Sequence, residues 1–374
     1  MREVIEDLLG WWRAGQPVGM ATVVGTWRSA PRPPGATMLV GPDGTAVGSV
    51  SGGCVEGAVY ELGQQVVGSG EPVLARYGVS DDEAFDVGLT CGGTIEIFVE
   101  RVDPASFPEL EQVTAAVAAA EPLALATVVA GPDPAALGRR LVVWPDRQSG
   151  TLGSDRLDRV VVEDARGMLA AGRTGPLGYG RDGQRMGEEL TVFVSGFAPP
   201  PRMIVFGAID FAAAVARIGS FLGYRVTVCD ARPVFATSRR FPGVEVVVDW
   251  PHRYLAGEVE AGRLDRRSVV CVLTHDPKFD VPALRVALAQ PVAYVGAMGS
   301  RRTHTDRIAR LRADGVPEPQ LARLASPIGL DLGARTPEET AVSIAAEIIA
   351  AQWGGGGQPL SELAGSIHQN LDRM

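Results

Sequence analysis

The chain has 374 residues, 46% of them hydrophobic, which is enough for two or three domains with buried cores. Its formal net charge of −9 argues against a general nucleic-acid-binding protein, which needs a basic surface to displace counterions. No apolar run approaches the ~18 residues that span a bilayer, and the acidic residues that follow Met1 argue against a signal peptide. We therefore expect a cytoplasmic protein with neither nucleic-acid nor membrane partners.

The N-terminal half contains similar segments in the same order twice. Residues 17–24 (PVGMATVV) resemble residues 122–129 (PLALATVV), and further matches follow at an offset of about 105, including Gly48-Ser49 with Gly153-Ser154. Any two β-α-β segments can share short sequence matches of this kind, but the common order of the matches favours a duplication. We predict an internally duplicated α+β domain over residues 1–198, built from two β-α-β repeats at about 1–101 and 102–198.

Prolines 199–201 mark a domain boundary, because proline is disfavoured inside helices and strands. Beyond them, short apolar runs alternate with helical segments. Runs that are apolar on both faces predict a mostly parallel sheet with helices on each side, here a Rossmann-like domain over residues 199–353. The predicted strands are 203–207, 225–230, 244–249, 268–274 and 292–296, and the predicted helices are about 209–222, 281–290 and 301–314.

A last helix is predicted from its capping residues. Thr336 is a good N-cap, and Glu339 completes a capping box with it. We expect the buried stripe of this helix to contain Val342, Ala345, Ala346 and Ile349. Glycines 354–357 end the helix, and residues 354–374 are expected to form a loosely held tail.

The first strand of the C-terminal domain leads into an altered dinucleotide-binding loop. Gly207 follows the strand, and Asp230 ends the next strand, where an acid can accept hydrogen bonds from a ribose. Ile209, however, stands where a glycine lets the backbone approach a pyrophosphate, and Asp210 adds negative charge at the helix N-terminus. The pattern favours a Rossmann-like fold and argues against conventional NAD(P) binding.

Two later loops follow the carboxyl ends of strands, where ligands bind in open α/β sheets. One contains His275. The other offers backbone N–H groups, the Ser300 hydroxyl and the Arg301 guanidinium to an anion. The alternatives are a loop histidine capped by an aspartate and an arginine in the solvated first turn of a helix.

The first repeat alone carries cysteines on glycine-rich loops, which suggests that this repeat holds the functional site and that the second supports it. Cys54 follows Ser51, Gly52 and Gly53 at the start of a helix predicted over about 54–68, a position that favours thiolate. A thiolate is both a soft metal ligand and a nucleophile. The alternative is a buried structural cysteine.

A second glycine-rich turn contains Cys91, followed by Gly92 and Gly93. If the two turns meet, Cys54 and Cys91 form a two-thiol site that can hold a soft metal or a sulfur species. Arg32, set rigidly among prolines, is a candidate clamp for phosphate or carboxylate. The other cysteines, Cys229 and Cys271, lie in apolar strands and are expected in the core, and the spacing of His and Cys is not that of a zinc site.

Taken together, several segments resemble the XdhC/CoxI family over nearly the whole chain. The N-terminal segments are 29–38 (SAPRPPGATM), 48–56 (GSVSGGCVE) and 89–93 (LTCGG). The C-terminal segments, similar to the Rossmann-like domain of the family, are 274–276 (THD), 295–301 (VGAMGSR) and 327–337 (PIGLDLGARTP). The chain departs from many relatives at Ile209 and Asp210, where they have glycine and histidine.

The resemblance implies an accessory protein for molybdenum hydroxylases such as xanthine dehydrogenase and carbon monoxide dehydrogenase. Such a protein binds molybdenum cofactor (molybdopterin), assists its sulfuration by a sulfurating enzyme, and hands it to the apo-enzyme. By resemblance, the cofactor contacts are Cys54 and Cys91, with Arg32 as a weaker anion contact. The cofactor is an anionic pterin with a soft metal, which suits thiolates, backbone N–H donors and arginine.

Two other functions remain open at this stage. One is an NAD(P)-dependent oxidoreductase that acts in a cleft between the domains. The other is a thiol redox protein, in which Cys54 and Cys91 form a reversible disulfide. No ferredoxin-type set of cysteines is present, so we do not expect the dehydrogenase itself. A symmetric homodimer is the expected assembly.

Overall fold

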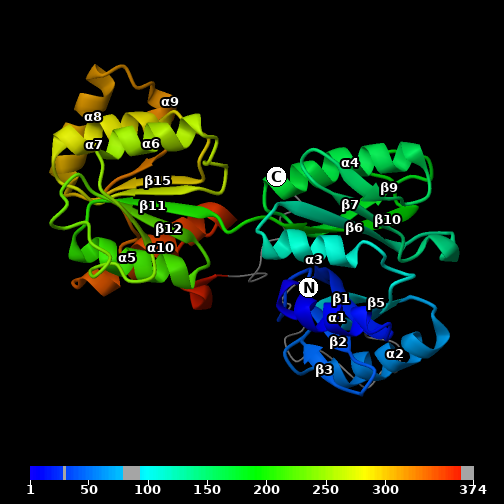
Figure 1. Cartoon of the computed structure of the whole chain (residues 1–374). Coiled ribbons are helices and arrows are strands. Elements are labelled where there is room, and N and C mark those ends of the chain that lie inside the picture. The colour runs from blue at the N-terminus through cyan, green and yellow to red at the C-terminus, as the bar shows by residue number, and fades with distance from the viewer. Residues whose placement is uncertain (28–30, 79–92, 364–374) are drawn as a thin grey trace. The chain divides into compact units, whose positions relative to one another are not determined.

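The structure is a computed structural model that describes every residue except 28–30, 79–92 and 364–374. The described chain forms two compact units, residues 1–199 and 200–363 (Figure 1). The predicted fold class is confirmed, since both units are mixed α/β and the second contains a parallel sheet.

The N-terminal unit contains two five-stranded sheets whose strand orders match, β3-β2-β1-β5-β4 and β8-β7-β6-β10-β9. The first repeat consists of α1 (Ile5–Arg13), β1 (Val18–Trp27), β2 (Thr37–Val40), β3 (Ala46–Gly48), α2 (Glu56–Ser69), β4 (Val73–Gly78) and β5 (Thr94–Val102). The second consists of α3 (Leu110–Ala118), β6 (Leu123–Ala130), β7 (Arg140–Val143), β8 (Gln148–Gly150), α4 (Asp155–Ala170), β9 (Gly175–Tyr179) and β10 (Leu190–Phe197). All pairings within both sheets are antiparallel.

The repeat differs from the sequence prediction in two respects. It is α-β-β-β-α-β-β rather than β-α-β, because short hairpin strands flank the main helix on both sides. The predicted match of Gly48 with Gly153 is also wrong, because the counterpart of Gly48 is Gly150. Both glycines end the third strand with positive φ (+84° and +87°). In each case a Cβ would come within 2.5 Å of a backbone oxygen of the preceding strand, that of Thr37 or of Arg140.

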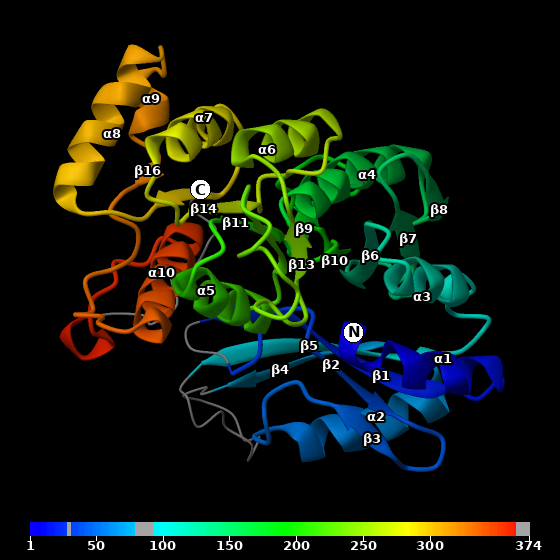
Figure 2. The ribbon, with the colours of Figure 1, turned by 60° about the vertical axis from the view of Figure 1, so that its left-hand side comes forward.

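The two repeats share one core. In Figures 1 and 2, α2 covers the outer face of the first sheet, α4 covers that of the second, and α1 and α3 lie between the sheets. The buried cluster between the sheets draws Leu8 from α1, Met20 from β1, Val113 from α3 and Leu125 from β6. Neither repeat could bury this apolar surface alone, so the duplication is part of what stabilises the unit.

The C-terminal unit has a six-stranded sheet of order β13-β12-β11-β14-β15-β16, with every pair parallel. Counted from β11, this order is 3-2-1-4-5-6, that of a Rossmann fold. The strands are β11 (Arg202–Phe206), β12 (Arg225–Cys229), β13 (Glu245–Val247), β14 (Val269–Val272), β15 (Tyr294–Ala297) and β16 (Leu324–Ala325). The helices are α5 (Asp210–Phe221), α6 (Pro251–Glu260), α7 (Pro277–Leu288), α8 (Arg301–Ala313), α9 (Glu318–Leu321) and α10 (Pro337–Trp353).

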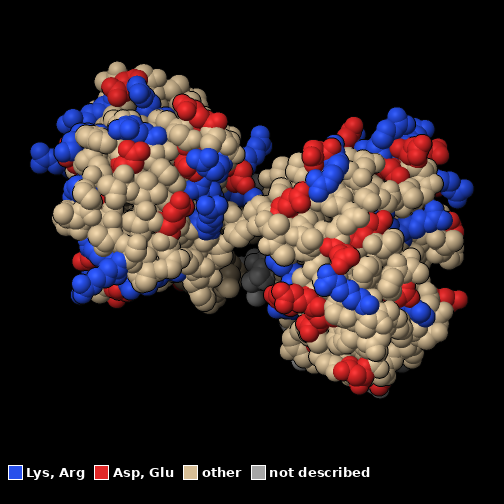
Figure 3. Space-filling view, viewed as in Figure 1, with Lys and Arg blue, Asp and Glu red and all other residues tan. Residues whose placement is uncertain are grey.

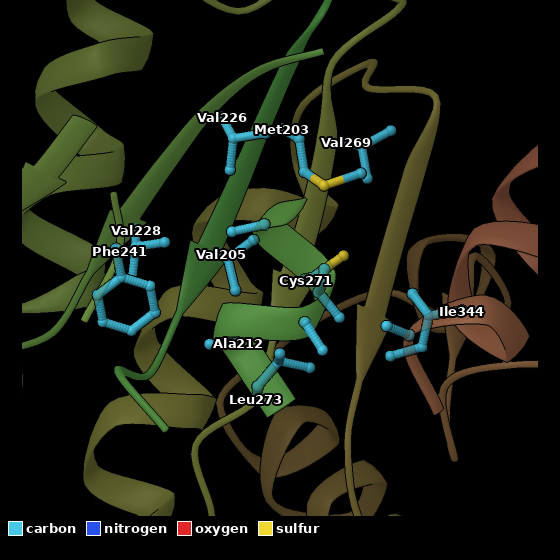
Figure 4. Close-up of a cluster of buried hydrophobic side chains, with 14 of the residues drawn as sticks. Met203, Val205, Ala212, Val226, Val228, Phe241, Val269, Cys271, Leu273 and Ile344 are labelled. Carbon is cyan, nitrogen blue, oxygen red and sulfur yellow. The ribbon is translucent and has the colours of Figure 1, made fainter. Parts of the chain in front are cut away.

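Both faces of this sheet are covered, with α5 and α10 on one side and α6 and α7 on the other (Figures 1 and 2). Alternate side chains of β11 enter different cores. Met203 and Val205 pack with Val226, Cys271 and Ile344 (Figure 4), whereas Ile204 and Phe206 pack in the cluster on the opposite face. This is why residues 203–206 are all apolar, rather than only alternate ones.

Some predicted helix boundaries were wrong. The helix predicted at 281–290 begins at Pro277, because Asp276 caps it and accepts a hydrogen bond from the Lys278 N–H at 3.1 Å. Proline fits the first turn of a helix, where no intrahelical donor is needed. The sequence prediction also missed α6, α9 and β16.

The last helix, α10, is capped as predicted but buries a different stripe. Thr336 accepts a hydrogen bond from the Glu339 N–H at 3.2 Å, and Glu339 accepts one from the Thr336 N–H at 3.1 Å. The expected stripe is wrong at its ends, because Val342 and Ile349 are 50% and 43% exposed. The helix is apolar over most of its circumference, so two overlapping stripes fit the sequence. The buried stripe is Ala341, Ile344, Ala345 and Ile348.

Basic and acidic side chains are interspersed over the face of each unit that Figure 3 shows. Exposed ion pairs include Arg217–Glu338 at 3.2 Å and Arg312–Glu318 at 2.5 Å. Pairs of this kind contribute about 0–1 kcal/mol each, so the stability of both units depends mainly on their buried cores.

Candidate functional site

The turn that precedes α2 folds around the carboxylate of Glu56. The Ser49 hydroxyl donates a hydrogen bond to Glu56 Oε1 at 2.7 Å, and the backbone N–H groups of Ser51 and Gly53 donate to Oε1 and Oε2 at 2.9 and 2.8 Å. The hydroxyl of Ser51, which is buried, also donates to Oε2. One side chain thereby fixes the whole glycine-rich turn.

The electrostatics of this turn keep Glu56 ionised. Burial acts to raise the pKa of Glu56, but the hydrogen bonds from Ser51 and Ser49 outweigh it and lower the pKa from 4.5 to about 2. Sequence analysis missed this residue. The available signal was a pair of serines five and seven residues before a glutamate, at the start of a helix.

These hydrogen bonds occupy the backbone donors that we expected to face an anion. The N–H groups of Ser51 and Gly53 point to Glu56, and the Gly52 N–H donates to the Ser49 hydroxyl at 3.0 Å. In this conformation the three N–H groups stabilise the turn. A ligand at this turn would therefore be recognised mainly by side chains.

Cys54 lies in the turn, two residues before α2. It is partly exposed and packs against the core beneath α2. The helix begins at Glu56, two residues later than predicted from Cys54, so the thiol lies outside the first helical turn. Gly52 and Gly53 have positive φ of +75° and +119°, and a Cβ at either position would meet no atom of the described residues within 4 Å. Nothing in the described part of the chain covers the surface at these two glycines.

The second repeat shows what is specific to this turn. There the Thr151 hydroxyl donates to Asp158 at 2.6 Å, and the Leu152 N–H donates to the same carboxylate at 2.8 Å. The helix α4 begins at Asp155, three residues before its carboxylate, whereas α2 begins at Glu56 itself. The first repeat has thus replaced one helical turn with the segment Gly53-Cys54-Val55.

The other predicted N-terminal site residues are only partly described. Cys91 and Gly92 lie outside the described residues, while Gly93 is buried directly before β5. Arg32 is partly buried and forms an ion pair with Glu3 at 2.9 Å. Within the described ranges, no group of three or more His, Cys, Asp or Glu residues is arranged to hold a metal ion.

In the C-terminal unit, Gly207 makes the tight turn after β11 with φ of +103°. A Cβ there would lie 2.9 Å from the Thr274 side chain, so only glycine fits. Asp230, at the end of β12, accepts hydrogen bonds from the Ala208 N–H at 2.7 Å and from the Arg232 guanidinium at 2.8 and 2.9 Å. It is almost fully buried, and Arg232 already occupies the carboxylate expected to bind ribose.

The start of α5 is also internally paired. Asp210 forms an ion pair with Arg240 at 2.9 Å, and Arg240 donates to the Ala208 carbonyl at 3.0 Å. Arg240 and Arg232 both lie over the ring of Phe235, at 5.7 and 4.6 Å from its centroid. A phosphate at this helix terminus would therefore meet a carboxylate that is already neutralised by an arginine.

The loops after β14 and β15 are described in full. His275 and Arg301 are exposed, and the Ser300 hydroxyl caps α8 by accepting a hydrogen bond from the Thr303 N–H at 3.1 Å. A buried network that sequence analysis missed lies beneath them. Arg307 pairs with Asp280 at 2.9 Å and donates to the Met298 carbonyl at 2.8 Å.

The fold and the site define a two-unit protein, with a duplicated α+β unit that presents a thiol on a glycine-rich turn and a Rossmann-type unit. Two family models match it: "XdhC and CoxI family" over residues 11–78 and 116–180, and "XdhC Rossmann domain" over residues 203–348. The chain belongs to the XdhC and CoxI family, which confirms the resemblance seen in the sequence.

Individual relatives agree with this assignment. The chain is 27% identical to a probable xanthine dehydrogenase subunit of Bacillus subtilis, over 88% of this chain and 92% of that protein. It is 27% identical to "Molybdenum cofactor insertion chaperone PaoD" of Escherichia coli, over 93% of this chain and 86% of that protein. A Bacillus halodurans protein, described from its crystal structure as a xanthine dehydrogenase, matches with a TM-score of 0.67 and 26% identity over 97% of each chain.

No helix among the residues that the structure describes is both long and apolar enough to cross a membrane.

Proposed function

We propose that this protein is a molybdenum cofactor-binding accessory protein that delivers the cofactor to an apo molybdenum hydroxylase of the xanthine dehydrogenase or carbon monoxide dehydrogenase type. The observation that carries this proposal is the similarity to a molybdenum cofactor insertion chaperone over 93% of the chain. Membership of the XdhC and CoxI family, through both its N-terminal and its Rossmann models, supports the same role.

The turn at Cys54 suits such a cargo in part. Cys54 is partly exposed, and none of the described residues fills the space beside Gly52 and Gly53, which suits a bulky ligand. Thiolate sulfur is a ligand that soft metals prefer. Glu56 keeps the turn in place without taking part in binding, since its oxygens already accept the hydrogen bonds of the turn.

Cys91 would supply the second thiol, with Gly92 and Gly93 beside it. The duplicated fold supports this pairing. In the second repeat, the β6–β7 loop, the turn before α4 and the β9–β10 loop line one pocket. The corresponding segments of the first repeat carry Arg32, Cys54 and Cys91 in chain order. Arg32 would contact an anionic group of the cargo after exchanging its partner Glu3.

The proposed partners are an apo molybdenum hydroxylase, a cofactor-sulfurating enzyme and a second copy of this chain, all in the cytoplasm. His275, Ser300 and Arg301, at the carboxyl edge of the Rossmann sheet, are proposed as contacts for a phosphate of the cargo, together with the turn at Gly207. The exposure of His275 and Arg301 supports this role. Light scattering of the purified protein tests the dimer.

The NAD(P)-dependent alternative has the strand order and the Gly207 turn in its favour. Against it stand the Asp230–Arg232 pair and the Asp210–Arg240 pair, since a dinucleotide would have to displace both. Titration with NADH and NADPH tests this alternative. Micromolar binding together with substrate turnover would favour an oxidoreductase over an accessory protein.

The decisive experiment compares wild type, Cys54→Ala, Cys91→Ala and Arg156→Ala after expression in a host that makes molybdenum cofactor. Arg156 is exposed and occupies the place of Cys54 in the second repeat, so its variant is the matched control. We expect molybdenum and pterin to co-purify with wild type and Arg156→Ala. In Cys54→Ala and in Cys91→Ala, the amount of retained cofactor should fall about tenfold. Equal retention by all four proteins would remove the thiols from the site, and no retention by any would oppose the function.

A further inference from the structure

The second repeat carries a surface pocket of about 420 Å³ at a place where sequence comparison suggested only a supporting scaffold. Three segments form it: the loop between β6 and β7, the turn that leads into α4, and the loop between β9 and β10. Its volume falls in the range of small-molecule sites, roughly 300–1,000 Å³.

The pocket lies at the same place in its repeat as the candidate thiol site does in the first. Equivalent hydrogen bonds establish the match. Gly35 donates its N–H to the Val23 carbonyl at 2.8 Å, and Gly138 donates to the Val128 carbonyl at 2.9 Å. Each of these glycines ends the loop that enters the second strand of its sheet. The pocket is therefore the second repeat's counterpart of the surface beside the Cys54 turn, with different side chains.

Two arginines, Arg139 and Arg181, are among the residues that line the pocket. Arg139 Nη1 lies over Gly153, where a Cβ would approach within 2.5 Å, so the glycine leaves room for the guanidinium. Within the described ranges of the chain, neither guanidinium forms an ion pair, in contrast to Arg147 and Arg185 of the same repeat. Arg139 Nε donates a hydrogen bond to the Ala135 carbonyl at 3.2 Å. Guanidinium groups without an acidic partner suit an oxyanion, which accepts their N–H bonds.

The acidic residues of the lining are bonded locally. Asp133 accepts a hydrogen bond from the Ala135 N–H at 3.0 Å, and Glu189 accepts one from the Arg181 N–H at 2.8 Å. Apart from Ser154, the remaining wall is apolar, and Leu152, Leu157 and Leu190 are all buried. A bare inorganic ion would leave this apolar wall unused.

We propose that this pocket binds a small organic oxyanion, a phosphate or a carboxylate on an apolar skeleton. Arg139 and Arg181 hold the anionic group, and the skeleton packs against Leu157 and Leu190. The site is separate from the thiol turn and does not depend on the proposed cofactor function.

Isothermal titration calorimetry tests the proposal with four probes: phenyl phosphate, benzoate, inorganic phosphate and phenol. The proteins are a Cys54→Ala parent, this parent with the double substitution Arg139→Gln/Arg181→Gln, and this parent with the control substitution Arg173→Gln, at an exposed arginine elsewhere in the same repeat. All carry Cys54→Ala, so that bound cofactor does not interfere. Circular dichroism confirms that each variant is folded.

We expect phenyl phosphate or benzoate to bind about tenfold more tightly than inorganic phosphate or phenol, because only the former fill both parts of the pocket. The double variant should lose at least about tenfold in affinity, and Arg173→Gln should match its parent. Whichever of phenyl phosphate and benzoate binds more tightly shows whether the site prefers a phosphate or a carboxylate. Unchanged affinity in the double variant, equal binding of inorganic phosphate, or no binding of either organic probe would overturn the proposal.

Discussion

Glu56 and Asp158 hold equivalent places in the two repeats of the N-terminal unit. The Ser49 hydroxyl donates to Glu56 at 2.7 Å and the Thr151 hydroxyl donates to Asp158 at 2.6 Å, and in each pair the acceptor follows the donor by seven residues. A carboxylate that gathers donors before the main helix is thus a property of the repeat. Only the first repeat adds the glycines and Cys54, so Glu56 positions the turn that presents the thiol.

Replacing Glu56 with alanine should destabilise the N-terminal unit by roughly 2–4 kcal/mol, because the buried Ser51 hydroxyl and two backbone N–H groups lose their acceptor. Urea unfolding followed by circular dichroism measures the change. The control is Glu61→Ala, an exposed position on the same helix, with an expected effect within about 0.5 kcal/mol. Equal stability of the two variants would contradict this account of the turn.

The contribution of Glu56 should depend on pH in a defined direction. Hydrogen bonds within the turn lower the pKa of Glu56 from 4.5 to about 2, so the folded state binds fewer protons than the unfolded state between these values. The stabilisation is complete above about pH 5.5 and is lost as the pH falls from about 4.5 to about 2. The difference in unfolding free energy between wild type and Glu56→Gln should shrink over that window. A difference that stays constant down to pH 2 would argue against a carboxylate-specific role.

The general fold could be predicted because its signals are local. Strands apolar on both faces, such as 203–206, predict a covered parallel sheet, and the Thr336–Glu339 capping box marks a helix start. The buried side of α10 could not be predicted, because Val342 and Ile344 are equally apolar and only packing on α5 distinguishes them. The short strands β3 and β8 carry no strong pattern of their own, since their pairing depends on the neighbouring strands.

The candidate site was predicted by residue type but not by bonding. Cys54 and its glycines stand out in the sequence, whereas Glu56 looks like an ordinary first-turn acid until the turn folds around it. Asp230 likewise matches a ribose-binding pattern, yet Arg232, two residues later, occupies its carboxylate. Sequence shows which groups are present, but which of them satisfy one another depends on the three-dimensional path of the chain.

The described cysteines should differ clearly in their rate of alkylation. Burial raises the pKa of Cys229 and that of Cys271 to about 12, and both side chains are inaccessible, whereas Cys54 is partly exposed. Because iodoacetamide reacts with accessible thiolate, native protein at pH 8 should be modified at Cys54 and spared at the two core cysteines. Peptide mass spectrometry before and after unfolding in urea reads this out. Equal modification of Cys271 and Cys54 in native protein would contradict the structure.

The buried stripe of α10 can be tested with two matched substitutions. Ile344 is 1% exposed and Ile349 is 43% exposed, although both are isoleucines on one helix. Ile344→Ala should cost roughly 2–4 kcal/mol of unfolding free energy, because it leaves a cavity against α5, and Ile349→Ala should cost less than about 1 kcal/mol. Urea unfolding gives both values. A larger loss of stability in Ile349→Ala than in Ile344→Ala would favour the buried stripe first expected from the sequence.

The Arg307–Asp280 pair should be the most sensitive polar contact at the carboxyl edge of the Rossmann sheet, because both side chains are almost fully buried. Arg307→Met leaves the buried Asp280 carboxyl group without its guanidinium partner, and should cost about 3–5 kcal/mol. Arg310→Met, at an exposed position of the same helix, is the control and should change stability by no more than about 0.5 kcal/mol. The double variant Arg307→Met/Asp280→Asn should recover part of the loss, because it leaves no unpaired charge inside the unit. A double variant that is less stable than Arg307→Met would contradict this account. The loss of stability in Arg307→Met would then come from lost packing and from the lost hydrogen bond to the Met298 carbonyl, not from the charge of Asp280.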